Sequence, residues 1–366
     1  MQKFRKISLV GTFLGLGALG IGVFNPPVAR SADFDGDQRQ DLVVIQKKET
    51  ETGTTEVNVL SGGSNFQEFI LQTGTGLQET MGGQFTFDVA ELDGDGKPDF
   101  IAVKKNGTAT GTIEVNVLSG ASTYQEFILQ IGTPLEETKK NLTLEVTDFD
   151  KDGKEDLLAI KKSKTATGTI EVNVLSGASN YQNFILQTST ALEETGENVV
   201  FETNFWDGDE IPDLFAIKKS GPWSLNEPPT ETTEVKVLSG GSNFQNLILQ
   251  TGTPLEPTGD NYDFELVDWN RDGKSDLFAN KKNGTATGTT EVKVLSGASN
   301  FQEFILQTGT PLEETGDNFD KLGFAINDDQ PFQPVPEPRS DATMVGIGVI
   351  GAGVLLRRRR RFHQRS

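Results

Sequence analysis

The sequence predicts an all-β protein, a β-propeller of five four-stranded blades. The first observation is an acidic motif that recurs five times. Its final aspartates, spaced 58, 57, 57 and 63 residues apart, are Asp41, Asp99, Asp156, Asp213 and Asp276. The second observation is that the same strand-like segments follow every motif, with Val-x-Val alternation and turn-forming residues between them. A repeat of about 40–60 residues that supplies four antiparallel strands is typical of a propeller blade.

Each repeat contributes its four predicted strands in a fixed order. In the last full repeat, one strand enters the acidic motif (residues 264–267) and one leaves it (residues 277–279). A Glu-Val-(Asn/Lys)-Val-Leu-Ser-Gly segment follows, as at residues 114–120, and then an aromatic-Gln-x-(Phe/Leu)-Ile-Leu-Gln run, as at residues 181–187. β-Branched residues and period-two alternation favour strands over helices. A parallel solenoid would have shorter coils and no set of four strands, so the propeller is the favoured architecture.

The two ends of the repeat array are complementary. The array starts directly at the motif of Asp33, so its first blade lacks the strand that enters the motif. At the other end, residues 317–320 match residues 260–263, where that strand begins in the preceding unit. We therefore expect residues 322–326 to pair with residues 42–45 and close the ring, which removes an edge strand open to aggregation. The alternative is that the closing segment starts a linker and leaves an open or dimeric ring.

The acidic motif has the form Asp-x-Asp-x-Asp-Gly-x-x-Asp, which is complete in residues 148–156. Acidic side chains at positions one, three, five and nine surround a tight turn with hard oxygen donors. This suits calcium, which prefers six to eight oxygens at about 2.3–2.6 Å. An EF-hand is excluded because its twelfth position, here Ala159, requires glutamate. The alternative is a metal-free Asp/Gly turn; five motifs in one register argue against it, because converging carboxylates repel each other without a cation.

The five motifs together predict side-chain and backbone ligands for five calcium sites. The side-chain ligands are Asp33, Asp35, Asp37, Asp41, Glu91, Asp93, Asp95, Asp99, Asp148, Asp150, Asp152, Asp156, Asp207, Asp209, Asp213, Asp268, Asn270, Asp272 and Asp276. Position seven is expected to supply a backbone ligand. Its residues are Arg39, Lys97, Lys154, Ile211 and Lys274.

The motifs are not equal. Gln38 and Glu210 replace the glycine at position six, and Phe205 replaces the first acid. The three motifs that begin at Glu91, Asp148 and Asp268 have all four side-chain ligands and the glycine, so they are expected to bind calcium best. The motif that begins at Phe205 is expected to bind most weakly.

Composition excludes several classes of function. The formal net charge of the 366 residues is −20, and because both ends are basic, the body between them is more acidic still. Such a body does not favour nucleic acid or anionic lipid. Cysteine is absent and the single histidine, His363, follows the terminal arginines, so the body has no disulfide, His-dependent triad or His metal site. No catalytic residue is predicted, because every unit repeats the same acids.

The ends of the chain are expected to be targeting segments. Residues 1–31 have a basic start, an apolar run and small residues before the end, which predict a signal peptide and export. The propeller is assigned to residues 32–327 and a linker to residues 328–341. Residues 342–366 combine an apolar run, read as a transmembrane segment, with an arginine cluster that would stay cytoplasmic. The alternative readings are an uncleaved anchor at the first end and an ordinary tail anchor at the second.

Two resemblances follow from these motifs. The acidic loops resemble the calcium-binding blades of the VCBS and FG-GAP repeat families, as in integrin α-subunit propellers, over about residues 33–327. That resemblance implies a propeller with calcium in the loop between the first two strands of a blade, although the Phe-Gly…Gly-Ala-Pro signature is absent. The tail, with Pro336, Glu337 and Pro338 before the apolar run and the arginines, resembles the PEP-CTERM sorting signal. It implies processing by an exosortase at the bacterial envelope.

The sequence therefore predicts an exported calcium-binding scaffold or adhesion module of the cell envelope or extracellular matrix, transiently anchored in the inner membrane. Extracellular polysaccharide and surface proteins are the expected partners. The alternative function is a secreted polysaccharide-processing enzyme, a carboxylate-pair glycoside hydrolase. Trp223, in a Gly/Pro-rich insertion of the fourth unit, is a possible ligand contact if exposed; the alternative is that it packs back onto its own blade.

Overall fold

The computed structural model describes residues 33–37, 39–80, 83–138, 141–223 and 231–323. These residues form strands β1 to β20 and three short 3₁₀ turns, Gly177–Ser179, Gly259–Asn261 and Gly316–Asn318. No helix in this part of the chain is long and apolar enough to cross a membrane. The predicted signal peptide, linker, sorting motif and tail lie outside the described residues.

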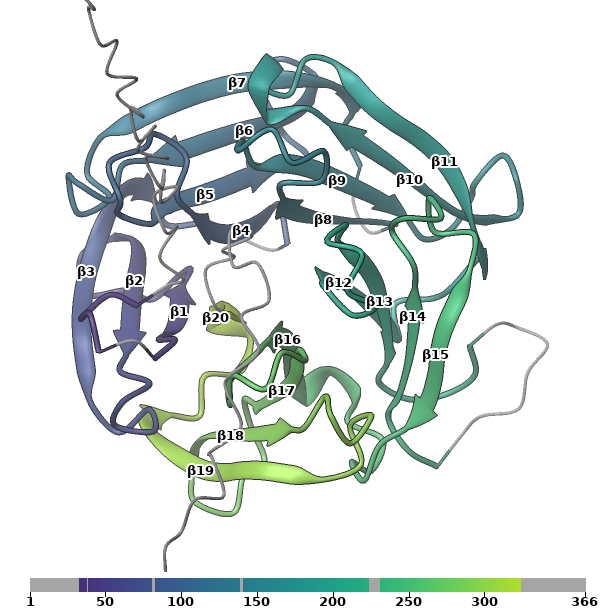
Figure 1. Ribbon diagram of the computed structural model, residues 1–366. Helices are drawn as coiled ribbons and strands as arrows, with labels where there is room; N and C mark the ends of the chain where they lie inside the picture. Colours follow the sequence, from purple (N-terminus) through teal and green to yellow (C-terminus); the bar gives the residue numbers. More distant parts are fainter. Residues whose placement is uncertain (1–32, 38, 81–82, 139–140, 224–230, 324–366) are drawn as a thin grey trace, which may run out of the picture. The chain divides into compact units, whose positions relative to one another are not determined.

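The described chain is a five-bladed β-propeller, as predicted (Figure 1). Each blade is a four-stranded antiparallel sheet. From the innermost strand outward, blade 1 contains β20 (Phe319–Gly323), β1 (Leu42–Gln46), β2 (Thr54–Leu60) and β3 (Phe69–Gln78). In the same direction, blade 2 contains β4 (Phe85–Ala90), β5 (Asp99–Lys104), β6 (Thr112–Leu118) and β7 (Phe127–Glu136).

The other three blades repeat this order. Blade 3 contains β8 (Leu142–Thr147), β9 (Asp156–Lys161), β10 (Thr169–Leu175) and β11 (Phe184–Glu193). Blade 4 contains β12 (Val199–Asn204), β13 (Asp213–Lys218), β14 (Glu234–Leu238) and β15 (Leu247–Gly252). Blade 5 contains β16 (Tyr262–Val267), β17 (Asp276–Lys281), β18 (Thr289–Leu295) and β19 (Phe304–Glu313).

Strand β20 closes the ring, which confirms the predicted pairing of the two ends of the array. It runs antiparallel to β1, with Val44 opposite Leu322 and Gln46 opposite Phe319. The strand begins at Phe319, earlier than the predicted Leu322, because it directly follows the 3₁₀ turn Gly316–Asn318. The turn Gly259–Asn261 precedes β16 in the same way. Residues 324–326 of the predicted closing segment lie outside the described part of the chain.

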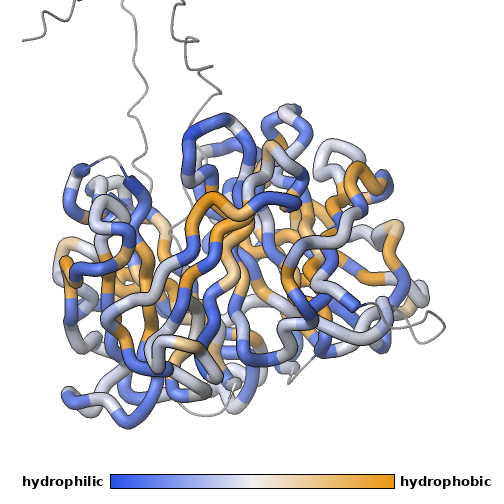
Figure 2. The backbone as a smooth tube through the Cα atoms, turned by 90° about the horizontal axis from the view of Figure 1, so that it is seen from below, coloured by the Kyte–Doolittle hydropathy of each residue, from blue (hydrophilic) through white to orange (hydrophobic). Residues whose placement is uncertain are grey.

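The hydrophobic core of the described residues consists of five clusters, each between two neighbouring blades. Between blades 1 and 2, for example, Ile45 and Val59 pack with Phe87 and Phe100. The last cluster joins Phe278 and other residues of blade 5 to blade 1, so the packing continues around the ring. In Figure 2, hydrophobic residues lie mainly along the strands, and hydrophilic residues gather in the loops at both ends of the strands. The apolar strand residues therefore form the core between the blades, and the loops at the ends of the strands are mostly polar.

The glutamine of the repeated aromatic-Gln segment links neighbouring blades. Its side-chain Nε2 donates to a backbone carbonyl in the outermost strand of the preceding blade, as from Gln182 to Gly132 at 2.8 Å. The same link recurs as Gln67 to Gly309, Gln125 to Gly74, Gln245 to Ser189 and Gln302 to Gly252. The link from Gln67 crosses the closure between blades 1 and 5.

Candidate metal centres

The acidic loops all lie at one end of the strands. Four of them connect the innermost strand of a blade to its second strand, and the first precedes β1 at the equivalent place. The ninth residue starts the second strand in blades 2 to 5 and immediately precedes it in blade 1. The sequence prediction that this aspartate connects the loop to a strand is therefore confirmed.

Left-handed backbone conformations explain the glycine at position six. Gly96, Gly153 and Gly273 have φ of 79°, 80° and 84°. Glu210 adopts the same conformation, with φ of 62°. A left-handed conformation costs a residue with a Cβ roughly 1–2 kcal/mol. The fourth loop therefore keeps the loop shape at the expense of local strain.

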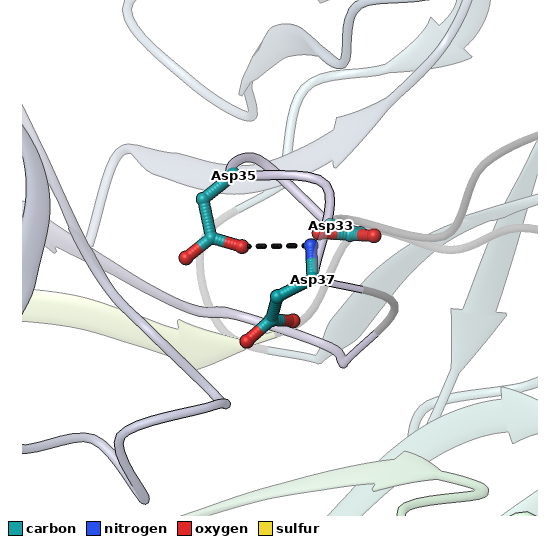
Figure 3. Close-up of side chains that lie close together, drawn as sticks. All are labelled: Asp33, Asp35 and Asp37. Atoms are coloured by element: carbon teal, nitrogen blue, oxygen red, sulfur yellow. Dashed lines mark hydrogen bonds between the residues drawn. The ribbon is translucent and has the colours of Figure 1, made fainter.

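Three carboxylate oxygens lie within 4.8 Å of one another in each of four loops. The groups are Asp33, Asp35 and Asp37; Glu91, Asp93 and Asp99; Asp148, Asp150 and Asp156; and Asp207, Asp209 and Asp213. Figure 3 shows the first group, in which the backbone N–H of Asp37 donates to Asp35 Oδ1 at 3.0 Å. The structure thus gathers most of the predicted side-chain ligands of these four loops.

The fifth loop has an amide in place of one carboxylate. No group of three close carboxylates forms there among the described residues, and Asn270 at position three offers an amide oxygen. The two carboxylate oxygens of Asp268 accept the N–H groups of Asp272 and Gly273, at 3.0 and 2.9 Å. Burial raises the pKa of the Asp268 carboxyl. Metal binding by Asp268, Asn270, Asp272 and Asp276 remains a prediction.

The ninth aspartate has a structural role that sequence reasoning missed. Asp156 is fully buried; its Oδ2 accepts the N–H of Phe149 at 3.0 Å, and its Oδ1 accepts the N–H of Gly177 at 2.8 Å. Gly177 lies in the turn between β10 and β11, so the carboxylate fastens the loop to that turn. The equivalent pairs recur on Asp41, Asp99, Asp213 and Asp276.

Burial also sets the acidity of these aspartates. It raises the pKa of Asp156 and Asp276 to about 7. It raises the pKa of Asp41, Asp99 and Asp213 to about 6, although the backbone donors oppose the shift. Since burial disfavours the charged form, a cation beside these carboxylates would compensate for that cost.

The residues fit a calcium ion. All donors are oxygens, as calcium prefers, and Oε2 of Glu91 is buried without a hydrogen-bond partner among the described residues. The backbone N–H of the residue at position seven donates to the carboxylate at position five, as from Lys154 to Asp152 at 2.9 Å. Coordination by the carbonyl of position seven remains a prediction.

Trp223 is not an exposed contact. Only 6% of it is exposed, and it belongs to the core cluster between blades 3 and 4. Its Nε1 donates to Glu234 Oε2 at 2.5 Å, and Lys236 Nζ lies 4.2 Å from the ring centroid. The prediction of a ligand contact is therefore wrong, because charged partners on β14 hold the indole against its own blade.

Sequence reasoning also missed buried acidic side chains on the innermost strands. Four carboxylates, each less than a tenth exposed, occupy equivalent positions in β4, β8, β12 and β16: Asp88, Glu145, Glu202 and Glu265. They alternate with residues of the inter-blade core, such as Phe87 and Val89. The signal in the sequence is their recurrence three residues before each of the last four acidic motifs.

Part of the chain matches a known repeat family. Residues 33–102 match a family described as an FG-GAP-like repeat. No curated protein matches the chain.

Several solved structures are similar at low identity. The catalytic domain of a GH62 alpha-L-arabinofuranosidase from Coprinopsis cinerea has 7% identity and a TM-score of 0.42, covering 76% of this chain and 77% of that chain. An alpha-L-arabinofuranosidase from Podospora anserina, in complex with cellotriose, has 9% identity and a TM-score of 0.40, covering 76% of both chains. An endo-arabinase from Bacteroides thetaiotaomicron has 13% identity and a TM-score of 0.35, covering 74% of this chain and 96% of that chain.

Proposed function

We propose that this chain is an exported, calcium-stabilised propeller that acts as a scaffold or adhesion module in the cell envelope or extracellular matrix. The observation that carries the proposal is the repetition of one acidic loop at one end of all five blades. Four of these loops bring three carboxylate oxygens within 4.8 Å of each other. A repeated structural cation, rather than a single catalytic centre, accounts for acids that every unit shares.

Calcium would act through folding. Each loop lies between the innermost and second strands of its blade, and its ninth aspartate is hydrogen-bonded to the next hairpin turn. A cation held by the loop would reduce repulsion among the carboxylates of a chain with net charge −20. Its binding free energy adds to the free energy of unfolding, because the unfolded chain has no preformed site.

Thermal unfolding tests this proposal. Millimolar calcium should raise the melting temperature well above its value in EDTA, and magnesium should substitute poorly, because it demands small octahedral sites. A tenfold change in free calcium above saturation should shift stability by about 1.4 kcal/mol per coupled site. Equal melting temperatures in EDTA and in calcium would rule out a structural metal.

The proposed partners are extracellular polysaccharide or surface proteins, and the second candidate function is polysaccharide hydrolysis. The buried carboxylates on the innermost strands, Glu145 and Glu202 among them, favour testing it. A polysaccharide panel should be screened for binding and for release of reducing sugar. We expect binding without breakdown; breakdown that Glu145→Gln or Glu202→Gln abolishes, in a protein that still folds, would establish the enzyme instead.

The tail belongs to the same proposal. The Pro-Glu-Pro motif at residues 336–338, the apolar run and the arginine cluster support sorting and cleavage at the envelope. Replacing the three motif residues with alanine should leave unprocessed, membrane-held protein. Equal processing of this variant and the parent, compared by mass spectrometry, would reduce the tail to a simple anchor.

A further inference from the structure

Two units depart from the repeat at two places at once. The loops of blades 1 and 4 lack glycine at position six, where they have Gln38 and Glu210. The same units have a second glycine in the Ser-Gly-x-Ser turn between their third and fourth strands, Gly63 and Gly241. The other three units have alanine at that place: Ala121, Ala178 and Ala298.

In blades 1 and 4, the carboxylate at position five of the loop occupies the space that an alanine methyl in the turn would fill. A Cβ on Gly63 would lie 1.8 Å from Asp37 Oδ2, and a Cβ on Gly241 would lie 2.0 Å from Asp209 Oδ2. Both distances are far below van der Waals contact, so the carboxylate and a methyl group exclude each other. The other oxygen of Asp209 accepts the N–H of Ile211 at 2.9 Å, a bond that the loops with alanine in the turn also make, as from Lys154 to Asp152.

Membership of the acidic clusters follows the same division. In blades 1 and 4 the fifth-position residues, Asp37 and Asp209, belong to the group of close carboxylates. In blades 2 and 3, where the turn has alanine, the groups consist of positions one, three and nine, and Asp95 and Asp152 are not members. The fourth loop depends most on this arrangement, because Phe205 supplies no first carboxylate.

We propose that Gly63 and Gly241 are positioning residues that leave room for the carboxylate at position five to join the group of close carboxylates that binds the cation. The ring then contains two classes of cation site. The class with glycine in the turn recruits Asp37 or Asp209, and the class with alanine uses the other acids. This inference rests on the proposed calcium binding. It predicts that Gly241→Ala removes a ligand from the fourth loop without touching the loop itself.

The fourth loop can be observed through its own tryptophan. Trp206 stands at position two of that loop, and its backbone N–H donates to Asp213 Oδ2 at 2.7 Å. In the full chain carrying Trp269→Phe, which removes the tryptophan of the fifth loop, terbium luminescence sensitised by Trp206 reports on the fourth loop and on the neighbouring fifth loop, whose Lys274 Nζ lies 5.2 Å from the Trp206 ring centroid. The part of the signal that Asp209→Ala shifts belongs to the fourth loop. We expect Gly241→Ala to raise the half-saturating terbium concentration about tenfold, the effect of losing one carboxylate ligand.

A double-mutant cycle separates positioning from folding. Asp209→Ala should weaken terbium binding as much as Gly241→Ala, and the two together should weaken it no further. Ala178→Gly, a matched change in the third blade, should leave the signal of the fourth loop unchanged. The metal-free melting temperature of Gly241→Ala should match that of its parent, because only the flexible end of Asp209 must move.

The outcomes distinguish the two levels of the proposal. If the parent binds terbium and calcium but Gly241→Ala has the same half-saturation, the positioning role is wrong and calcium binding stands. A weakening that persists in the Asp209→Ala background, with a lower metal-free melting temperature, assigns Gly241 to folding and also overturns the inference. A parent that binds neither ion, by luminescence or calorimetry, overturns the proposed function and this inference with it.

Discussion

At the scale of single residues, the aspartate at position nine of each loop stabilises the fold through hydrogen bonds that need no metal. In the third blade, removing the Asp156 side chain would leave the partly buried N–H groups of Phe149 and Gly177 without acceptors. A fully buried donor left unsatisfied costs about 1–3 kcal/mol. Since these two donors are partly buried, we expect Asp156→Ala to lower the free energy of unfolding by about 1–3 kcal/mol in EDTA. Asp152→Ala, at an exposed position of the same loop, should cost less than about 1 kcal/mol. Urea unfolding of both variants checks this, and equal losses would contradict it.

The same aspartates give the metal-free protein an unusual pH dependence. Their pKa values in the folded state, about 6 to 7, lie above the ordinary 3.8 of the unfolded chain. Between these values the folded state binds more protons than the unfolded state, so stability rises as pH falls. We expect the melting temperature in EDTA to increase from pH 8 to pH 5. In calcium the trend should reverse, because protons compete with the cation for the carboxylates. Melting temperatures that change with pH in the same way in EDTA and in calcium would refute a role of these aspartates in calcium binding.

At the scale of elements, a polar network holds the Trp223 ring beside strands β13 and β14. Nζ of the fully buried Lys218 lies 2.9 Å from Glu234 Oε2, which also accepts the N–H of the Trp223 indole. Trp223→Ala should destabilise the protein by about 3–5 kcal/mol. Trp223→Phe keeps a ring beside Lys236 but loses the hydrogen bond to a charged group, worth about 1.5–3 kcal/mol. Denaturant unfolding that ranks the two variants equally would show that the hydrogen bond contributes nothing.

The sequence predicted the elements well where the evidence was local. Five units in one register predicted the blades, the strand after each acidic loop and the closing strand. The sequence alone could not decide between exposure and packing for Trp223, because the Gly/Pro-rich segment predicts an exposed loop, while its partners Glu234 and Lys236 follow the insertion and become neighbours only in the fold. The role of Gly63 depends on a contact with Asp37 between two turns, and no periodicity in either turn reveals it.

At the scale of the whole molecule, stability depends on closure. Strand β20 supplies the innermost position of blade 1, and β20 contacts both β16 and β4, its neighbours around the ring. A chain that ends at Asn318 should therefore unfold at a markedly lower melting temperature, with an exposed β1 edge that promotes association. Thermal unfolding and light scattering test this. A chain that ends at Gly323 is the matched control, and an undiminished melting temperature in the shorter chain would contradict the role of closure.

The position of β20 also bears on how the protein is made. Because synthesis runs from the N-terminus, β1, β2 and β3 emerge first, yet their sheet remains a strand short until residues 319–323 have left the ribosome. Pairing between such distant segments is slow, since a long loop must close before any contact forms. A polypeptide that stops early, through a nonsense codon or a protease nick, can assemble interior blades but never its first. The last strand therefore makes closure depend on chain length, and only a chain translated at least as far as Gly323 gains the packing that resists degradation.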